Sequence, residues 1–261
     1  MQIEEARVVR HTTLGEGGYS ALVLDSPGVA PYIKPGQFVT LRIPGLDGAV
    51  LRRPFSVHRT DGTTLTILYK VVGRGTEAMQ SLTPDNTINL LGPLGNGFPL
   101  ELDADVLPVL VAGGYGMAPL YGLARALARK GLVFVGGSSE RDILCTAEFE
   151  QLGWPVHVAT MDGSRGMRGL VTGALDAWLA RNPDQPVQMY ACGPHGMLKA
   201  VSERALQRNC TAWLSLDRHM GCGVGACLAC VQKVRREGKI VWARVCKDGP
   251  IFDAREIVWE E

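Results

Sequence analysis

The sequence of 261 residues has no excess of charge of either sign, because 27 basic side chains stand against 26 acidic ones. A balance of this kind gives no electrostatic reason to expect nucleic acid or an anionic membrane as a general partner. The opening residues, MQIEEARVVRH, contain two glutamates and no apolar core of a secretory signal. We therefore predict a cytoplasmic protein.

The sequence also lacks an unbroken apolar run of membrane-spanning length. One stretch without charge, residues 106–124, is interrupted by two prolines and by a cluster of glycines. These interruptions favour a strand, a glycine turn and a helix over one spanning helix. We expect no membrane span.

An even set of cysteines, which a secreted disulfide framework needs, is absent, since the chain has seven. Four of them form one pattern: Cys222, Cys227, Cys230 and, after fifteen further residues, Cys246. The spacing C-x4-C-x2-C with a distant fourth cysteine is typical of a loop that wraps a [2Fe-2S] cluster with thiolates. The sequence therefore predicts these four residues as the ligands of such a cluster.

The glycines around these cysteines favour a cluster over the other metal centres considered. Gly221, Gly223 and Gly225 permit positive φ angles and a close approach of backbone amides to sulfur. A structural zinc site and plain reduced core cysteines stay open as alternatives, although zinc usually takes two separate C-x2-C knuckles. A Rieske centre needs two histidines in place of two cysteines, and His219 has no paired histidine.

The chain is predicted to be α+β and to have three domains. Short β-rich runs with turns between them fill residues 1–101 and indicate an antiparallel barrel or sandwich. Strand-like and helix-like segments alternate over 102–209, which predicts a parallel sheet with crossover helices. Residues 210–261 are too few for an independent core, so a metal staple is expected there.

One pair of segments in the first domain is suited to a pyrophosphate. The segment GRGT, residues 73–76, places a glycine turn at the start of an expected helix, where free N–H groups and the positive dipole end favour phosphate. Arg53, in the run RRPFSV, and Lys70 can add charge at the same place. An exposed strand arginine is the plainer interpretation of Arg53.

Two strand-to-helix turns in the second domain consist of small residues. A parallel sheet binds a dinucleotide at this position, although the first turn is not a strict G-x-G-x-x-G. His195 is expected to be a surface or helix-start residue, and Arg141 is either a contact for an NADP 2′-phosphate or a solvent-facing arginine. Cys192 also fits the role of a small buried residue. The NAD-binding candidates are Gly113, Gly114, Gly116, Cys192 and Gly193.

Taken in this order, the motifs resemble those of the ferredoxin-reductase-like flavoproteins, and most closely the electron-transfer subunits of class 1B dihydroorotate dehydrogenases. The resemblance covers nearly the whole chain. Its motifs are RRPFSV, GRGT, LLGPLGNGFPL, AGGYGMAPLYGLA, MDGSRGMRGLVT, ACGPHGML, HMGCGVGACLAC and RVCKDGPIFDAREIVW. It implies an FAD-binding β-barrel, an NAD-binding α/β domain and a small [2Fe-2S] domain.

The resemblance also implies which residues hold the cofactors. Phe55 stands where the family often has tyrosine, so a ring face is kept and a hydroxyl contact is lost. The same four cysteines carry over as cluster ligands, and we identify no catalytic acid, base or nucleophile. The implied flavin residues are Arg53, Pro54, Phe55, Ser56, Leu68, Tyr69, Lys70, Gly75 and Thr76.

In that family an FMN-containing partner subunit oxidises dihydroorotate in pyrimidine biosynthesis, and electrons pass through the cluster and FAD to NAD+. A flavin is needed between the cluster and NAD+ because the cluster moves one electron at a time and the nicotinamide takes two as hydride. The expected assembly contains two copies of each chain. The alternatives are a flavin subunit of a sulfhydrogenase or of an NADH-dependent ferredoxin:NADP oxidoreductase, and a redox-sensing module without turnover.

Overall fold

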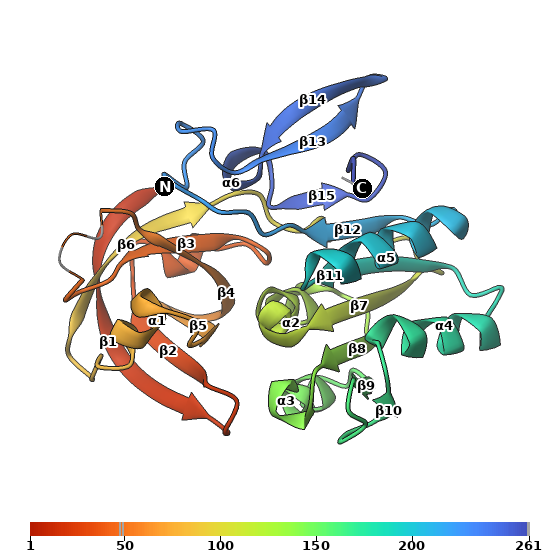
Figure 1. Ribbon diagram of the computed structural model, residues 1–261, viewed down its shortest axis with the longest axis horizontal. Helices are drawn as coiled ribbons and strands as arrows, with labels where there is room; N and C mark the ends of the chain where they lie inside the picture. Colours follow the sequence, from red (N-terminus) through yellow and green to blue (C-terminus); the bar gives the residue numbers. More distant parts are fainter. Residues whose placement is uncertain (47, 49, 260–261) are drawn as a thin grey trace.

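The computed structural model describes residues 1–46, 48 and 50–259. It consists of an antiparallel barrel, a mainly parallel sheet with helices on both faces, and a C-terminal segment that carries a hairpin (Figure 1). The predicted α+β fold class is confirmed. No helix in the described residues is long and apolar enough to cross a membrane. The uncharged stretch 106–124 forms a strand, a 3-10 turn and a helix, as the sequence predicts.

The barrel closes in the order β1-β2-β5-β4-β3-β6 with antiparallel pairing throughout. Alternate residues such as Leu22 and Leu24 point inward and are fully buried, which is the period-two pattern of a half-buried strand. The β-rich runs predicted over residues 1–101 form six strands. They are β1 (Gln2–Leu14), β2 (Tyr19–Asp25), β3 (Phe38–Arg42), β4 (Arg53–Asp61), β5 (Thr64–Lys70) and β6 (Thr87–Leu94), with the short helices η1 (Ala30–Tyr32) and α1 (Arg74–Met79).

The second part is a sheet in the order β10-β9-β8-β7-β11-β12-β15. All neighbouring strands are parallel except β15, which runs antiparallel to β12. The strands are β7 (Leu107–Gly113), β8 (Leu132–Gly137), β9 (Val156–Thr160), β10 (Met167–Arg168), β11 (Val187–Cys192), β12 (Ala212–Ser215) and β15 (Ile251–Asp253). The helices are η2 (Gly114–Gly116), α2 (Met117–Ala126), η3 (Glu140–Asp142), α3 (Thr146–Gln151), α4 (Val171–Arg181) and α5 (His195–Gln207).

Side-chain alternation divides the two faces of this sheet. Val109 and Val111 of β7 pack in the core that contains α4 and α5, whereas Leu110 and Ala112 pack with α2 and α3. All four residues are fully buried, as expected for a strand covered by helices on both faces. Helix α2 also contacts barrel strand β4, so it lies between the two parts (Figure 1).

The C-terminal segment has no separate core. It contains the hairpin β13 (Val231–Arg236) and β14 (Lys239–Arg244) and the short helix α6 (Val245–Asp248). Its buried residues Val234, Ala243 and Val245 belong to the same cluster as Leu214 of the sheet and Phe38 of the barrel. The segment is therefore packed across both larger parts, above them in the view of Figure 1.

Candidate functional site

The cysteine-rich loop between β12 and β13 folds its own backbone around Cys222. Backbone N–H groups of Val224, Ala226 and Cys227 donate to its Sγ at 3.4, 3.2 and 3.4 Å. The Cys222 N–H in turn donates to Cys227 Sγ at 3.4 Å. Burial works to raise the pKa of the Cys222 thiol, but these amides lower it overall to about 6. The thiolate, which is the form that ligates iron, is thus favoured near neutral pH.

Glycines allow the loop to turn back on itself. Gly223 and Gly225 have φ angles of +72° and +85°, in the left-handed region that favours glycine. Gly221 does not have a positive φ, and its contribution is space, because a Cβ there would lie 3.0 Å from Cys227 Sγ. Gly223 and Gly225 therefore allow the predicted positive φ angles, and Gly221 allows the backbone to lie close to the sulfur of Cys227.

Cys230 and Cys246 form a second, buried pair of thiols. The Cys246 N–H donates to Cys230 Sγ at 3.4 Å, and both residues are only 2% exposed. Burial, followed by the effect of Cys230, raises the pKa of the Cys246 thiol to about 12. This thiol becomes a ligand when a metal displaces its proton.

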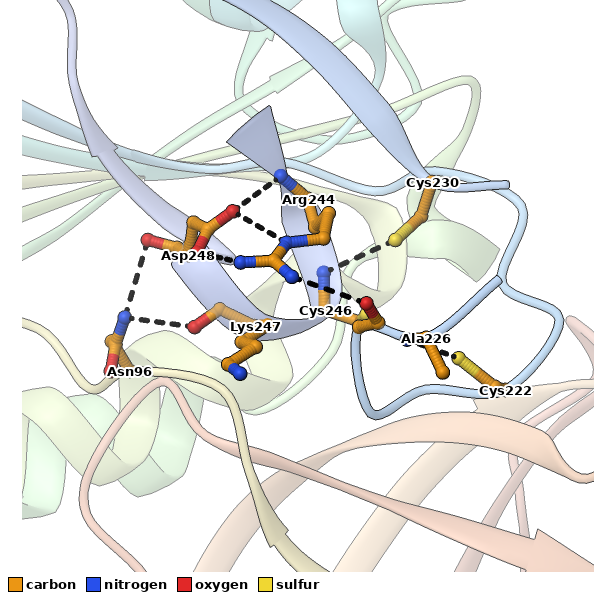
Figure 2. Close-up of polar contacts among 9 residues, drawn as sticks. Asn96, Cys222, Ala226, Cys230, Arg244, Cys246, Lys247 and Asp248 are labelled. Carbon is orange, nitrogen blue, oxygen red and sulfur yellow. Dashed lines mark hydrogen bonds and ion pairs between the residues drawn. The ribbon is translucent and has the colours of Figure 1, made fainter. Parts of the chain in front are cut away.

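Polar contacts join helix α6, which carries Cys246, to the cysteine-rich loop and to the segment that follows barrel strand β6 (Figure 2). Arg244 makes a two-pronged ion pair with Asp248 at 3.0 and 3.1 Å and donates from Nη1 to the Gly225 carbonyl at 3.2 Å. Asn96, which follows barrel strand β6, donates from Nδ2 to the carbonyls of Lys247 and Asp248, each at 3.2 Å. These bonds hold the fourth cysteine in place relative to the other three.

The arrangement of the four sulfurs separates an iron–sulfur cluster from a zinc site. Four thiolates on one tetrahedral zinc would lie about 3.8 Å from one another, given a zinc–sulfur distance of about 2.3 Å. Within residues 1–46, 48 and 50–259, no three of these cysteines place their sulfurs within 4.8 Å of one another. Backbone N–H···S bonds link the four residues two by two, Cys222 with Cys227 and Cys246 with Cys230, and a [2Fe-2S] cluster needs two thiolates on each iron. The residues fit a two-iron cluster better than zinc.

The segments predicted to hold flavin meet at the end of the barrel. The side chain of Arg53, at the start of β4, packs beside helix α1, and a Cβ on Gly75 would lie 3.3 Å from Arg53 Nε. Thr76 closes the turn before this helix, because its Oγ1 accepts the N–H groups of Val72 and Gly73 at 2.9 and 3.2 Å. An arginine and the first turn of a helix thus lie together, which suits an anionic group.

The remaining candidates from the flavin motif lie in different environments. Phe55 is half-buried and packs edge-on against Tyr69, with ring centroids 6.1 Å apart. Tyr69 is 3% exposed in the barrel core, and its hydroxyl lies 2.8 Å from Nε2 of His11. Leu68 is buried, whereas Pro54 and Ser56 are half-buried on the opposite side of β4 from Phe55.

A cleft of about 790 Å³ lies between the barrel and the carboxyl ends of β7, β8 and β11. In a parallel sheet, this is where nucleotides bind. Its lining includes all five NAD-binding candidates, Gly113, Gly114, Gly116, Cys192 and Gly193. The structure thus brings together two turns that are nearly eighty residues apart in the sequence.

The glycines of these turns are needed for contact between the turns themselves. A Cβ on Gly116 would lie 2.1 Å from the Cys192 carbonyl oxygen, and one on Gly193 would lie 2.9 Å from the Gly113 nitrogen. Real Cβ atoms do not approach backbone so closely. Burial raises the pKa of the Cys192 thiol to about 12, so this cysteine is a neutral thiol at the floor of the cleft.

Lys70, which the sequence predicts near a pyrophosphate, lines the cleft together with residues that no motif predicts. Lys70 Nζ and the Tyr19 hydroxyl both donate to Asp142 Oδ1, at 2.9 and 2.8 Å, across the boundary between barrel and sheet. Tyr115 and Asp217 also line the cleft, and burial raises the pKa of the Asp217 carboxyl.

Arg141 and His195 both have exposed side chains. Arg141 is 65% exposed and pairs with Glu16 at 3.1 Å. His195 begins α5, lines the cleft and packs edge-on against Trp259, with ring centroids 5.0 Å apart. A helix-start position for His195 is what the sequence predicts.

Comparison with known protein families divides the chain in the same order. Residues 110–203 match the family described as "Oxidoreductase NAD-binding domain", and residues 217–258 match "Iron-sulfur cluster binding domain of dihydroorotate dehydrogenase B". Two curated relatives carry the name "Dihydroorotate dehydrogenase B (NAD(+)), electron transfer subunit". The protein of Geobacillus kaustophilus is 40% identical over 98% of both chains, and that of Desulforamulus reducens is 39% identical over 90% of this chain and 91% of its own.

Solved structures share this fold. A structure described as that of an NADH-dependent reduced ferredoxin-NADP oxidoreductase matches 98% of this chain and 90% of its own, with a TM-score of 0.85 and 31% identity. The cytochrome b5 reductase domain of Ulva prolifera nitrate reductase matches 80% of this chain and 94% of its own, with a TM-score of 0.63 and 18% identity. The second likeness concerns the fold alone.

Proposed function

The chain belongs to the family of electron transfer subunits of dihydroorotate dehydrogenase B (NAD(+)), and from this we propose that it conveys electrons from an FMN-containing, dihydroorotate-oxidising subunit to NAD+. One observation carries the proposal. The four cysteines lie in a segment that packs on the barrel, and the same chain has a cleft at the carboxyl ends of a parallel sheet, where dinucleotides bind. When bound, the [2Fe-2S] cluster exchanges single electrons and FAD exchanges one or two, which matches the two-electron chemistry of NAD+.

We assign Cys222, Cys227, Cys230 and Cys246 as the residues that hold the cluster. The backbone amides around Cys222 donate to sulfur, and such bonds stabilise negative charge on the ligands. The Arg244–Asp248 pair orients the helix that bears the fourth ligand. In this assignment, these residues position the [2Fe-2S] cluster and tune its reduction potential, while the cluster itself supplies the electron transfer.

The flavin assignment rests on β4, the end of β5 and the start of α1. Arg53 and the first turn of α1, which contains Gly75 and Thr76, are assigned to the pyrophosphate, and Pro54 and Ser56 follow Arg53 along β4. Leu68, Tyr69 and Phe55 shape the barrel end beneath it. We assign Lys70 to the boundary of the flavin and nicotinamide regions, because it lines the cleft as well.

The cleft between barrel and sheet is assigned to NAD+. Gly113, Gly114 and Gly116 in one turn and Cys192 and Gly193 in the other line its floor. Close backbone approach to the cofactor is possible there because these positions carry little or no side chain. No side chain of the cleft is assigned a proton transfer, since hydride moves between two cofactors.

The partner is the catalytic subunit that the relatives' name implies. We propose that two copies of each chain assemble, and that the complex works in the cytoplasm. None of the seven cysteines forms a disulfide in the described residues.

A second candidate is the flavin subunit of an NADH-dependent ferredoxin-NADP oxidoreductase, because the solved structure of that description aligns over nearly the whole chain. Co-expression with the candidate partner separates the two. We expect an FMN-containing protein to co-purify and the complex to reduce NAD+ when dihydroorotate is added. Co-purification of a larger iron–sulfur subunit, with no dihydroorotate-dependent reduction of NAD+, would contradict the first assignment and favour the second.

A further inference from the structure

A second group of metal-binding side chains lies at the boundary between the barrel and the sheet, apart from the cysteine-rich loop. It consists of His58 from β4, Cys145 directly before α3, and Glu148 within α3. Their Nε2, Sγ and carboxylate oxygen atoms all lie within 4.8 Å of one another. None of these residues takes part in the electron route described above.

The orientation of His58 is fixed from two sides. Its Nδ1 lies 3.3 Å from the carbonyl oxygen of Ala118, and its Nε2 lies 3.1 Å from Oε2 of Glu148. With a metal bound, Nδ1 can donate its N–H to this carbonyl while Nε2 serves as the ligand atom. The ring also stacks on Tyr121, with centroids 4.6 Å apart. A histidine that donates its other ring N–H to a backbone carbonyl is the usual arrangement at a metal.

The Glu148 carboxylate also has a neighbour on each of its two oxygens. Its Oε1 lies 3.9 Å from Arg59 Nη1, which leaves Oε2 directed at His58 Nε2, 3.1 Å away. Nitrogen and oxygen ligands on one tetrahedral zinc lie about 3.3 Å apart, given bonds of about 2.0–2.2 Å. The observed 3.1 Å, which is also the distance of a hydrogen-bonded pair, is close to that spacing, so both ligand atoms can be retained when a metal enters.

The charges of the group also suit a divalent cation. A thiolate, a carboxylate and a neutral imidazole together balance a charge of two beside His58, which is only 2% exposed, and the Arg59 guanidinium lies outside this ligand set at 3.9 Å from Glu148 Oε1. Ligation by the Cys145 thiol releases its proton. The Glu148 side chain is 37% exposed, which leaves a side of the site open to water.

We propose that His58, Cys145 and Glu148 form a three-ligand site for a divalent cation with the nitrogen, sulfur and oxygen preference of zinc. Because His58 comes from the barrel and the other two ligands come from the sheet region, the bound metal joins the two parts whose boundary is the cleft. The site stabilises their relative placement.

Zinc is the probe in the test, applied to holoprotein with its full content of FAD, iron and acid-labile sulfide. After equilibration with zinc and removal of the free ion, we expect one zinc per chain. X-ray absorption at the zinc edge should show one sulfur and otherwise nitrogen or oxygen neighbours. Cys145→Ser and Glu148→Gln should each weaken zinc binding at least about tenfold and reduce the zinc-induced rise in melting temperature. Cys210→Ser, at another half-buried cysteine, should change neither.

Three outcomes would overturn the proposal. Holoprotein that binds no zinc would mean that His58 and Glu148 form only an ion pair. Zinc surrounded by four sulfurs would place it on the cluster cysteines instead. Equal zinc affinity of Cys145→Ser and the unaltered protein would exclude Cys145 as a ligand.

Discussion

A Cβ built on Gly223 would lie only 3.0 Å from Cγ2 of Thr40, so the cysteine-rich loop rests directly on the outer face of barrel strand β3. Thr40 is 2% exposed and is paired with Pro54 of β4, one of the flavin candidates. Directly opposed residues of an antiparallel pair share a face of the sheet. The contact therefore places the proposed cluster ligands beside the strand proposed to bind FAD.

Replacing Gly223 with alanine should lower cluster content without removing FAD. The substitution imposes a left-handed backbone on a residue with a Cβ, which costs about 1–2 kcal/mol, and it forces the loop away from Thr40. Iron and acid-labile sulfide per FAD are the measurement.

Gly238 offers a matched control in the turn between β13 and β14. Its φ of +75° carries the same backbone penalty, but a Cβ there meets nothing within 4 Å. Gly238→Ala should keep its cluster. Equal loss in the two variants would mean that general destabilisation, and not the contact with Thr40, explains the effect.

Replacing Gly75 with valine should weaken FAD binding at least tenfold, about 1.4 kcal/mol. The reason is crowding, because a Cβ at this position already lies 3.3 Å from Arg53 Nε and valine adds two methyl groups. Titration of flavin-depleted protein with FAD measures the affinity. The FAD affinity of Gly75→Ala should lie between those of the valine variant and the unaltered protein, since the end of the Arg53 side chain can shift. Undiminished FAD affinity of the valine variant would place the pyrophosphate elsewhere.

Local patterns in the sequence were sufficient for most of the architecture. The six strands of the barrel and the alternation of strands and helices from β7 to α5 are predicted by runs such as YSALVLD and VLPVLVAGG. The hydrophobic pattern of such a run indicates a strand without reference to distant parts of the chain. The spacing of the cysteines was enough to select the loop. The division of the chain after residues 101 and 209 stays a prediction.

Long-range pairings could not be predicted in the same way. Strands β12 and β15 join the sheet from within the C-terminal segment, and nothing in AWLS or IFD specifies the neighbour of a short apolar strand. Lys70 is predicted to add charge at a pyrophosphate and, from the resemblance, to lie among the flavin residues. Its contact with Asp142 joins residues 72 positions apart and exists only because the barrel and the sheet meet there.

The Lys70–Asp142 pair should contribute stability that depends on pH. Burial works to raise the pKa of Asp142, but hydrogen bonds from Lys70 and Tyr19 lower it overall, and Asp142 raises the pKa of Lys70. A lowered carboxyl pKa gives stability that is lost as pH falls through the folded value, and a raised lysine pKa gives stability that is lost as pH rises through its folded value.

We therefore expect Asp142→Asn to lower the free energy of unfolding by about 1 kcal/mol or less, since Lys70 is one-third exposed. The difference should be constant between about pH 5 and pH 9 and shrink below about pH 4. Denaturant unfolding of holoprotein at several pH values measures it. Glu16→Gln, which removes the exposed pair with Arg141, should have no comparable effect. A difference that persists undiminished at acid pH would show that the charge pair is not its source.

Cys227→Ser should separate the two halves of the proposed electron route. Serine is a poor ligand for the iron of a cluster, so the variant should lose or impair the [2Fe-2S] group. The flavin strand and the nicotinamide cleft do not include Cys227, and its side chain lies in an exposed part of the loop. We expect NADH to reduce the FAD of the variant at a near-normal rate, while dihydroorotate-dependent reduction of NAD+ in the complex falls to background.

The comparison requires variant protein that retains FAD and its partner, because the C-terminal segment packs against both larger parts and its loss of order could act indirectly. Cys210→Ser serves as the control, since it alters a half-buried cysteine outside the loop and should leave both reactions unchanged. A variant that lacks the cluster, keeps its partner and still passes electrons from dihydroorotate to NAD+ at the full rate would exclude these cysteines from the route. In that case the cluster would have only a structural role, and the packing of Gly223 on Thr40 would serve stability alone.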